Sequence, residues 1–495
     1  MPAHHHDFSA ASKESVHISL LALALDNNPY AINFFNSSNE LLGGDVQSYV
    51  LDQLTRKITN YENFNKTYPG FGGFLPWYNA NDTGIFLMSG YWSQRVPSLD
   101  NGEMIWGLVA AYKKLADIGQ TALAARYKNY IDMLAKNALI VFMDTTNNDT
   151  VFGIRTVSLI NDTKAMPTTS NYGRDPGDTG LLNDPYEGEL FLLFADLFSD
   201  WSNFGGQASK DRIWAGKQKN EFIRSLSTPQ GQISVEQGWE FSSHEKWKYM
   251  ELPYFDSPIV NQTYLNGEKA RTWFSYMNNY AGMFAAVTNI SVPGRNDTYN
   301  PNYIGEGITP LAESPTQNTI VTPYGAFPLL LHPVSKPYGL VWYANMLSGS
   351  KMQGPQGSTE SISLDGQYIA PINTWDSKIT SVMAFCGGIF DITRDYLNQT
   401  GTYNRFYQLV DTLYSTTFSG ILEGTNIDFK LPSAAFTRTQ TFSSCGGSNT
   451  PSPSTCSDMS SDCFSYLSFC NVQSYHSQMC KQCRKTCNLC SDTTC

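Results

Sequence analysis

The sequence predicts a mainly α-helical domain over residues 15–435, a linker over 436–455 and a small disulfide-rich module over 456–495. Three observations support this division. Apolar residues in the first part recur at helical spacing. The linker is rich in Ser, Thr, Gly and Pro, which is typical of an extended or flexible connection. Eight of the ten cysteines lie between Cys456 and Cys495, which is a density typical of a disulfide framework.

Within the first domain, apolar side chains predict helices over 104–115, 123–134, 190–198 and 379–390. Segments rich in Gly, Asn and Pro separate them, and the longest lie at 67–84 and 293–323. Loops of this length in a compact domain usually serve a function. Cys386 lies in an apolar helical stretch, so we expect a buried free thiol there.

The composition limits the classes of function. Charged residues make up 16% of the chain and aromatic residues 13%, and the formal net charge is −11. Nucleic-acid binding requires clustered Lys and Arg, so we expect no nucleic-acid partner. The apolar stretch from Ile18 to Leu25 is too short to span a bilayer. Many aromatic rings suit a carbohydrate-handling protein, but a large aromatic core would give the same composition.

Two features point to a secreted protein. One is the cysteine-rich C-terminus, and the other is a set of N-x-S/T sequons, several of which chance alone would supply. The segment from Met1 to Ser15 does not resemble a signal peptide, so we expect a secretory signal to have been removed or to lie outside this sequence. We also expect a monomer. The sequons are at Asn36, Asn65, Asn81, Asn148, Asn161, Asn261, Asn289, Asn296 and Asn398.

The C-terminal cysteines have the spacing C-x6-C-x6-C-x12-C-x3-C-x2-C, which resembles the ShK-toxin-like (ShKT) domain over its full length. The resemblance implies the pairs Cys456–Cys490, Cys463–Cys483 and Cys470–Cys487. Cys480 and Cys495 depart from the six-cysteine pattern and could pair with each other. A module of this size depends on such bridges, because it cannot bury a sufficient core. We expect an interaction or structural appendage with an unknown partner, and the oxidising context argues against a zinc site.

The first domain contains no HExxH, GxSxG, GxxxxGK[ST] or helix-opening GxGxxG motif. Carboxylates embedded in aromatic segments are instead plentiful. That pattern favours acid–base chemistry on a glycosidic bond, which needs one protonated and one ionised carboxyl group.

Six segments in order resemble the glucoamylase-like (α/α)6-barrel domains. Among these they are most similar to the endo-β-1,2-glucanases and to relatives of the cyclic β-1,2-glucan synthases, over most of 79–391. The segments are Ser98-Leu99-Asp100-Asn101-Gly102, Asp184-Pro185-Tyr186-Glu187-Gly188-Glu189-Leu190-Phe191, Gly238-Trp239-Glu240-Phe241-Ser242-Ser243-His244-Glu245-Lys246-Trp247, Ala270-Arg271-Thr272-Trp273, Gly357-Ser358-Thr359-Glu360-Ser361 and Ile372-Asn373-Thr374-Trp375-Asp376.

The resemblance implies inverting hydrolysis of a glucan without a metal or other cofactor. Glu187 would protonate the leaving oxygen, and Asp376 would deprotonate the attacking water. An inverting pair lies roughly 6.5–9.5 Å apart, which leaves room for that water. The acid needs a raised pKa, from burial or from a carboxylate such as Glu189, and Glu189 could itself be the acid.

Other residues of these segments are candidates for substrate binding. Glu240, Glu245 and Glu360 could act as acid or base. Glu240 and Glu360 could instead bind substrate, and Asp100 could orient a sugar. Arg271 and His244 could donate hydrogen bonds to hydroxyl groups. We expect about two or three of the tryptophans to stack on sugar, because most tryptophans in proteins belong to the core. These tryptophans are Trp77, Trp92, Trp106, Trp239, Trp273 and Trp375.

Each carboxylate also has a structural interpretation. Asp184-Pro185-x-Glu187 and Asp100-x-x-Glu103 both fit a helix start, and Asp376 could cap the helix that runs to Gly387-Gly388.

Two alternative functions stay open as well. One is a polysaccharide lyase on the same barrel, whose product would absorb ultraviolet light, and the other is a non-catalytic glycan-binding protein.

Overall fold

The computed structural model divides the chain into two compact units, Phe8–Arg438 and one that contains Thr439–Cys495. The first unit therefore begins ahead of residue 15, where the sequence placed its start. The structure describes residues 8–36, 45–81, 83–147, 151–183, 186, 188–285, 287–288, 303–304, 306–314, 316, 318–349, 352–354, 357–366, 368–370 and 374–436, and in the C-terminal module 458, 463, 467, 470–472, 475–490 and 492.

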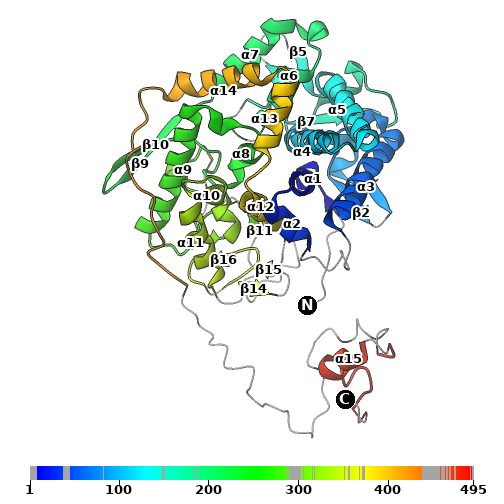
Figure 1. Ribbon diagram of the computed structural model, residues 1–495, viewed down its shortest axis with the longest axis vertical. Helices are drawn as coiled ribbons and strands as arrows, with labels where there is room; N and C mark the ends of the chain where they lie inside the picture. Colours follow the sequence, from blue (N-terminus) through cyan, green and yellow to red (C-terminus); the bar gives the residue numbers. More distant parts are fainter. Residues whose placement is uncertain are drawn as a thin grey trace. The chain divides into compact units, whose positions relative to one another are not determined.

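The first unit is mainly helical (Figure 1). Its helices are α1 (Ala11–Leu25), α2 (Pro29–Asn36), α3 (Val46–Thr67), α4 (Ser98–Asp117), α5 (Thr121–Phe142), α6 (Glu189–Phe198), α7 (Gly206–Gln218), α8 (Lys248–Glu251), α9 (Pro258–Met277), α10 (Phe327–Leu331), α11 (Lys336–Leu347), α12 (Trp375–Cys386), α13 (Phe390–Gln399) and α14 (Tyr403–Phe418).

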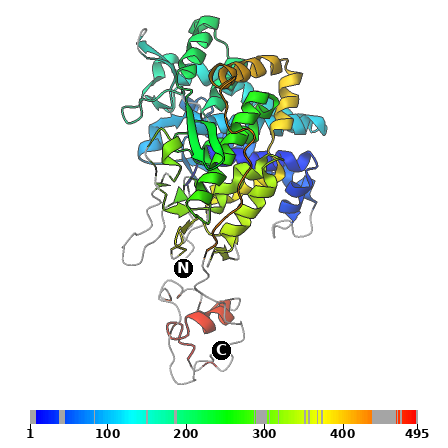
Figure 2. The same cartoon turned by 90° about the vertical axis from the view of Figure 1, so that its left-hand side faces the viewer.

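Short strands lie between the helices in the chain and pair with one another in small antiparallel sheets (Figure 2). Three-stranded sheets join β1 (Phe8–Ser9), β2 (Tyr78–Asn81) and β3 (Gly84–Leu87), and β4 (Arg95–Pro97), β7 (Val157–Ile160) and β8 (Tyr172–Arg174). The paired strands are β5 (Met143–Asn147) with β6 (Val151–Ile154), β9 (Ile223–Thr228) with β10 (Gly231–Glu236), β11 (Val287–Thr288) with β12 (Tyr303–Ile304), β13 (Ile320–Val321) with β16 (Ile362–Ser363), and β14 (Gln353–Gly354) with β15 (Gly357–Ser358).

The helices form the (α/α)6 barrel that the resemblance implied. Helices α1, α4, α6 and α10 are buried along most of their length, whereas α3, α7, α13 and α14 bury only a stripe. This difference separates an inner from an outer layer. α4 packs against α1, α5, α6 and α13, while α1 also contacts α3 and α12. Figure 1 shows α1, α8 and α12 between the group α9–α11 and the group α3–α5.

The apolar periodicity located three helices correctly, since α4, α5 and α6 contain the predicted segments 104–115, 123–134 and 190–198. The fourth prediction joined two helices. α12 ends at Cys386, and Gly387 follows with φ = 95°, a left-handed C-cap that glycine adopts without steric cost. Phe390 then begins α13. Cys386 is buried and free, as expected.

The C-terminal module contains α15 (His476–Gln482) and the bridges Cys463–Cys483 and Cys470–Cys487 that the resemblance implied. Cys480 and Cys490 are also disulfide-bonded. Their expected partners, Cys495 and Cys456, lie outside the described residues, as does nearly all of the predicted linker.

No helix within the described residues is both long enough and apolar enough to cross a bilayer.

Gly102 allows α4 and α6 to lie close together. A Cβ atom at this position would be 2.7 Å from the Phe191 backbone nitrogen and 2.9 Å from its Cβ. We expect Gly102→Ala to lower the free energy of unfolding by about 1–3 kcal/mol, because backbone must move to admit the methyl group. Gly216→Ala in α7 is the control, since nothing lies within 4 Å of its Cβ position. That variant should gain up to about 1 kcal/mol. Equal denaturation midpoints for both variants would contradict the close packing.

Two partly buried groups on α1 make the stability of the first unit depend on pH. Burial lowers the pKa of His17 to about 3, and Lys57 acts in the same direction. Burial would raise the pKa of Glu14, but Lys57 and Tyr61 hold it at about 2. Both folded-state pKa values are below those of the unfolded chain, so their stabilisation is complete above about pH 6.5 and is lost as the pH falls.

We therefore expect the free energy of unfolding to fall between pH 6.5 and 3 through His17, and between about 4.5 and 2 through Glu14. His17→Phe should flatten the curve between pH 6.5 and 4.5 by about 1.4 kcal/mol per pH unit, because one proton-uptake step disappears. Denaturant titrations at several pH values measure this slope. Parallel curves for the wild type and the variant would show that His17 is not buried in its neutral form.

Candidate active site

The first two turns of α1 connect three parts of the barrel. The Ser12 hydroxyl donates a hydrogen bond to Asp100 in the first turn of α4. The Lys13 ammonium lies 5.4 Å from the Trp247 ring centroid, just before α8. One turn further along, His17 meets Trp375 edge-on, with ring centroids 5.4 Å apart. Since Lys13 and His17 are four residues apart, they lie on the same face of α1. The starts of α1, α4, α8 and α12 therefore lie together at this end of the barrel.

Asp100 organises the aromatic residues beside α1. Its Oδ2 accepts a hydrogen bond from Trp77 Nε1 at 3.1 Å. The rings of Phe8 and Trp92 stack on Trp77, with interplanar angles of 8° and 14°. Protein rings thus take the contact area that a sugar would need, so Trp77 supports Trp92 rather than forming a stacking subsite itself. The capping interpretation of Asp100 is wrong, because α4 begins at Ser98 with Pro97 as the N-cap.

The segment before α8 is a tightly held loop. Glu245 Oε1 accepts the backbone N–H groups of Glu240 at 2.8 Å and Ser242 at 3.4 Å. Between them, Phe241 has φ = 52°, a left-handed conformation that is costly for a bulky residue and that clusters at functional sites. Burial raises the pKa of Glu245 to about 7. The loop leaves Trp239 47% exposed while Glu240 is nearly buried, so Trp239 is the residue that can meet a ligand.

Tyr324 joins this loop to the helix that follows it. Its hydroxyl accepts a hydrogen bond from Trp247 Nε1 at 2.8 Å and lies 3.3 Å from His244 Nδ1. His244 is therefore oriented by a buried phenol. The contact also fixes Trp247, the residue that Lys13 of α1 covers.

The start of α12 presents Trp375, which is 48% exposed. Thr374 is the N-cap, and its hydroxyl accepts the Ser377 backbone N–H at 3.3 Å. Thr374 therefore performs the capping role that the sequence had offered to Asp376. The Asp376 backbone lies in the first turn of α12, and its side chain lies outside the described part of the structure.

Glu187 lies outside the described residues, but the residues on either side of it are fixed. The Tyr186 hydroxyl donates a hydrogen bond to Glu313 at 3.1 Å, and the Glu313 backbone N–H binds the Gly238 carbonyl oxygen at 2.8 Å. The chain before residue 187 is thereby tied to the loop that exposes Trp239. α6 begins two residues after Glu187 with Gly188 as the N-cap, and the predicted capping residues Asp184 and Glu187 lie outside the described residues.

The surroundings of Glu189 argue against the roles of general acid and sugar ligand that the sequence suggested. Its carboxylate is fully buried and lies 3.0 Å from Lys217 Nζ and 3.3 Å from Lys248 Nζ. Tyr254 donates a third contact at 2.7 Å. Burial alone would raise the pKa of Glu189, but the two lysines hold it below its usual value. An ionised, enclosed carboxylate has no proton to give and no path to substrate.

Three more of the predicted residues are buried and donate hydrogen bonds to backbone carbonyl oxygens. Arg271 is buried and donates to the carbonyl oxygens of Phe284 and Gly325. The buried Trp273 donates to the Asp428 carbonyl oxygen at 2.9 Å, and the buried Trp106 donates to that of Leu190 at 3.0 Å. Isolated motifs do not reveal that these groups are buried, and this burial argues against the prediction that Arg271 and Trp273 bind substrate.

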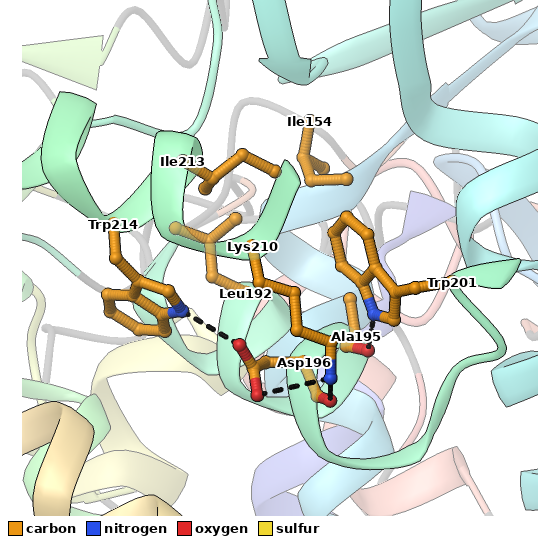
Figure 3. Close-up of a pocket in the computed structure, with 8 residues that line it drawn as sticks. All are labelled: Ile154, Leu192, Ala195, Asp196, Trp201, Lys210, Ile213 and Trp214. Atoms are coloured by element: carbon orange, nitrogen blue, oxygen red, sulfur yellow. Dashed lines mark hydrogen bonds and ion pairs between the residues drawn. The ribbon is translucent and has the colours of Figure 1, made fainter. Parts of the chain in front are cut away.

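A small hollow between α6 and α7 is not the site (Figure 3). Figure 3 shows Asp196 between Trp214, whose Nε1 donates at 3.0 Å, and Lys210 at 3.5 Å. The hollow is otherwise lined by Ile154, Leu192, Ala195, Trp201 and Ile213. None of the sequence-predicted site residues lines it, and its charged groups bind one another.

Ser12, Lys13 and His17 are the residues that sequence reasoning missed. Their partners in α4, the Trp247 segment and α12 are distant in the chain, and Ser12 and Asp100 are 88 residues apart. The available signal was a lysine and a histidine one turn apart at the start of a helix whose second half is apolar.

Comparisons with known proteins agree with this architecture. The family model described as endo-beta-1,2-glucanase SGL matches residues 1–446, and a model described as ShK domain-like matches residues 455–490. No curated protein matches the chain.

Solved structures are similar over most of the chain. An endo-β-1,2-glucanase from Talaromyces funiculosus is 32% identical with a TM-score of 0.79, over 88% of this chain and 85% of that one. It was solved with sophorose, and a glutamate-to-glutamine mutant was solved with β-1,2-glucan. An endo-β-1,2-glucanase from Chitinophaga pinensis, solved with sophorotriose and glucose, shares the fold at 12% identity, with a TM-score of 0.51 over 84% and 87% of the two chains. The chain therefore belongs to the endo-β-1,2-glucanase SGL family of glycoside hydrolases.

Proposed function

We propose that this chain hydrolyses β-1,2-glucan with inversion, with Glu187 as the general acid and Asp376 as the base that activates water. One observation carries the proposal: Lys13 and His17 lie one turn apart on α1 and contact Trp247 and Trp375 respectively. Trp375 precedes Asp376 in the chain. Trp247 precedes Lys248, which binds Glu189 two residues beyond Glu187. These contacts, direct for the Asp376 segment and indirect for the Glu187 segment, link both candidates to the same two turns of α1 and support the proposal.

The exposed indoles support a substrate path through this region. Trp375 adjoins Asp376, and Trp239 belongs to the loop to which Tyr186 is tied through Glu313. Flat aromatic faces suit the apolar faces of pyranose rings. Glucose units that rest on Trp239 and Trp375 would hold the intervening linkage beside the two acids. The glucan and sophorose complexes of the T. funiculosus enzyme support the same substrate class.

The proposed chemistry follows from these roles. The protonated Glu187 carboxyl donates its proton to the glycosidic oxygen as the bond to the anomeric carbon breaks. Asp376 removes a proton from the water that attacks the opposite face of the same carbon. The configuration at this carbon inverts, so a β-linkage yields an α-anomeric product. Pro97 and Thr374 occupy the N-cap positions of α4 and α12, the two helices whose starts the sequence had offered to Asp100 and Asp376.

The family assignment favours a hydrolase over the lyase alternative. A lyase product would absorb ultraviolet light, whereas hydrolysis releases reducing ends without such absorbance. Binding of β-1,2-glucan without release of reducing ends would instead favour the non-catalytic alternative.

The protein is further proposed to be secreted and to act as a monomer. The bridges of the C-terminal module support an oxidising compartment. Of the sequon asparagines that the structure describes, Asn36, Asn81, Asn161 and Asn398 are exposed.

We expect Glu187→Gln and Asp376→Asn each to lower kcat on β-1,2-glucan by about 10²–10⁴-fold, because each removes one proton transfer. Reducing-end assays measure the loss, and Asp391→Asn is the control. Asp391 is an exposed carboxylate at the start of α13 that pairs with Arg394. That variant should keep its turnover.

Polarimetry or NMR during the first minutes of hydrolysis should detect the α-anomer. Early β-anomer would contradict inversion, and near-normal turnover in either carboxylate variant would remove that residue from its role.

A further inference from the structure

Glu360 lies buried beneath the start of α12. Its side chain is about 4% exposed, and its Oε2 accepts hydrogen bonds from the hydroxyls of Thr374 at 2.8 Å and Ser377 at 2.6 Å. Lys378 Nζ lies 4.0 Å from the same oxygen. These donors leave Glu360 enclosed by protein, which argues against the roles of acid, base or sugar ligand that the sequence suggested.

The two hydroxyl donors bracket the residues that face substrate in the proposed mechanism. Thr374 precedes Trp375 and Asp376, and Ser377 follows them. The Thr374 and Ser377 hydroxyls also lie 2.9 Å from each other, and the Ser377 N–H donates to Thr374 Oγ1. One carboxylate oxygen therefore ties both ends of the first turn of α12 to a single point.

Glu360 is itself held in place by its backbone. Its carbonyl oxygen accepts a hydrogen bond from the buried Thr322 hydroxyl at 2.6 Å. Thr322 is the N-cap of the short 3₁₀ helix that contains Tyr324, the residue that binds Trp247. Glu360, which lies below α12, is thus connected through Thr322 and Tyr324 to Trp247, at the end of the loop that precedes α8.

We propose that Glu360 is a positioning residue, which fixes the first turn of α12 so that Trp375 and Asp376 meet the glucan in a single orientation. The inference rests on the proposed function of Asp376. The first turn of a helix has unsatisfied N–H groups and frays readily, and a displacement of about 1 Å at a reacting group can cost about 10²-fold in rate. An internal acceptor shared by two hydroxyls opposes that displacement.

The test compares Glu360→Ala with Glu360→Gln. Alanine removes the acceptor, whereas glutamine keeps one carbonyl oxygen that can accept from both hydroxyls but cannot act as an acid or base. The control is Asp45→Ala, because Asp45 Oδ2 likewise accepts from the backbone and hydroxyl of Ser48 at the start of α3. All variants are assayed as the full chain, below the onset of melting, for kcat and KM on β-1,2-glucan and for amide hydrogen exchange of residues 374–380.

We expect Glu360→Ala to lower kcat by at least about 30-fold with a smaller change in KM, and to speed exchange of the Ser377 amide about tenfold or more. Glu360→Gln should stay within about fivefold of the wild type in both measurements, and Asp45→Ala should leave kcat unchanged. The inference is overturned if glutamine is as damaging as alanine, if alanine leaves kcat intact, or if exchange at Ser377 does not change.

The exchange measurement keeps this inference separate from the proposed function. An active Asp376→Asn enzyme would remove Asp376 as the base, while fast exchange in Glu360→Ala would still support Glu360 as the anchor of α12. Slow exchange in that variant would overturn the anchor even if Asp376 proved essential.

Discussion

The close packing of α1 against α4 is the constraint on which the rest of the site depends. Gly107 permits it, because a Cβ there would lie 2.9 Å from the Ser15 carbonyl oxygen. The Ser15 hydroxyl oxygen then lies 2.8 Å from the Glu103 carbonyl oxygen and 2.5 Å from Glu251 Oε1. With α1 enclosed in this way, its first two turns occupy one fixed place at the end of the barrel. The helix starts that carry the candidate residues are arranged around that place.

Buried ion pairs supply much of the rigidity around it. Glu14 is held by Lys57 and by the hydroxyls of Tyr61 and Tyr78, and Glu189 is held by Lys217 and Lys248. Buried charges of this kind add little net stability relative to apolar groups, but removing one partner is strongly destabilising. The consequence is that the first turns of α1 and α6 have few alternative arrangements. Such pre-organisation is what a reaction that depends on two placed carboxyl groups requires.

The sequence was informative where a local pattern carries the physics. Helical periodicity located α4, α5 and α6, because it depends on residues close in the chain. The resemblance to the ShKT domain implied the bridges Cys463–Cys483 and Cys470–Cys487. The ordered series of motifs also identified the family. A C-cap glycine separates α12 from α13, which the apolar pattern alone did not resolve.

The sequence was misleading where burial decides the role. Glu189, Arg271 and Trp273 belong to motifs that resemble a binding site, yet tertiary packing gives each an internal partner. Trp77 meets protein rings in place of sugar, and Glu360 meets two hydroxyls. Ser12, Lys13 and His17 could not be found, because their partners are far away in sequence and only the fold brings them together.

The central claim is that a glucan lies across the first two turns of α1, between the segments of Glu187 and Asp376. A crystal structure of the Asp376→Asn variant with a β-1,2-linked oligosaccharide tests it most directly. The account predicts sugar rings on Trp239 and Trp375, the Glu187 carboxyl within hydrogen-bond reach of a glycosidic oxygen, and residue 376 facing the opposite side of the adjoining anomeric carbon. An oligosaccharide bound away from α1, or both residues on the same side of the sugar, would contradict it.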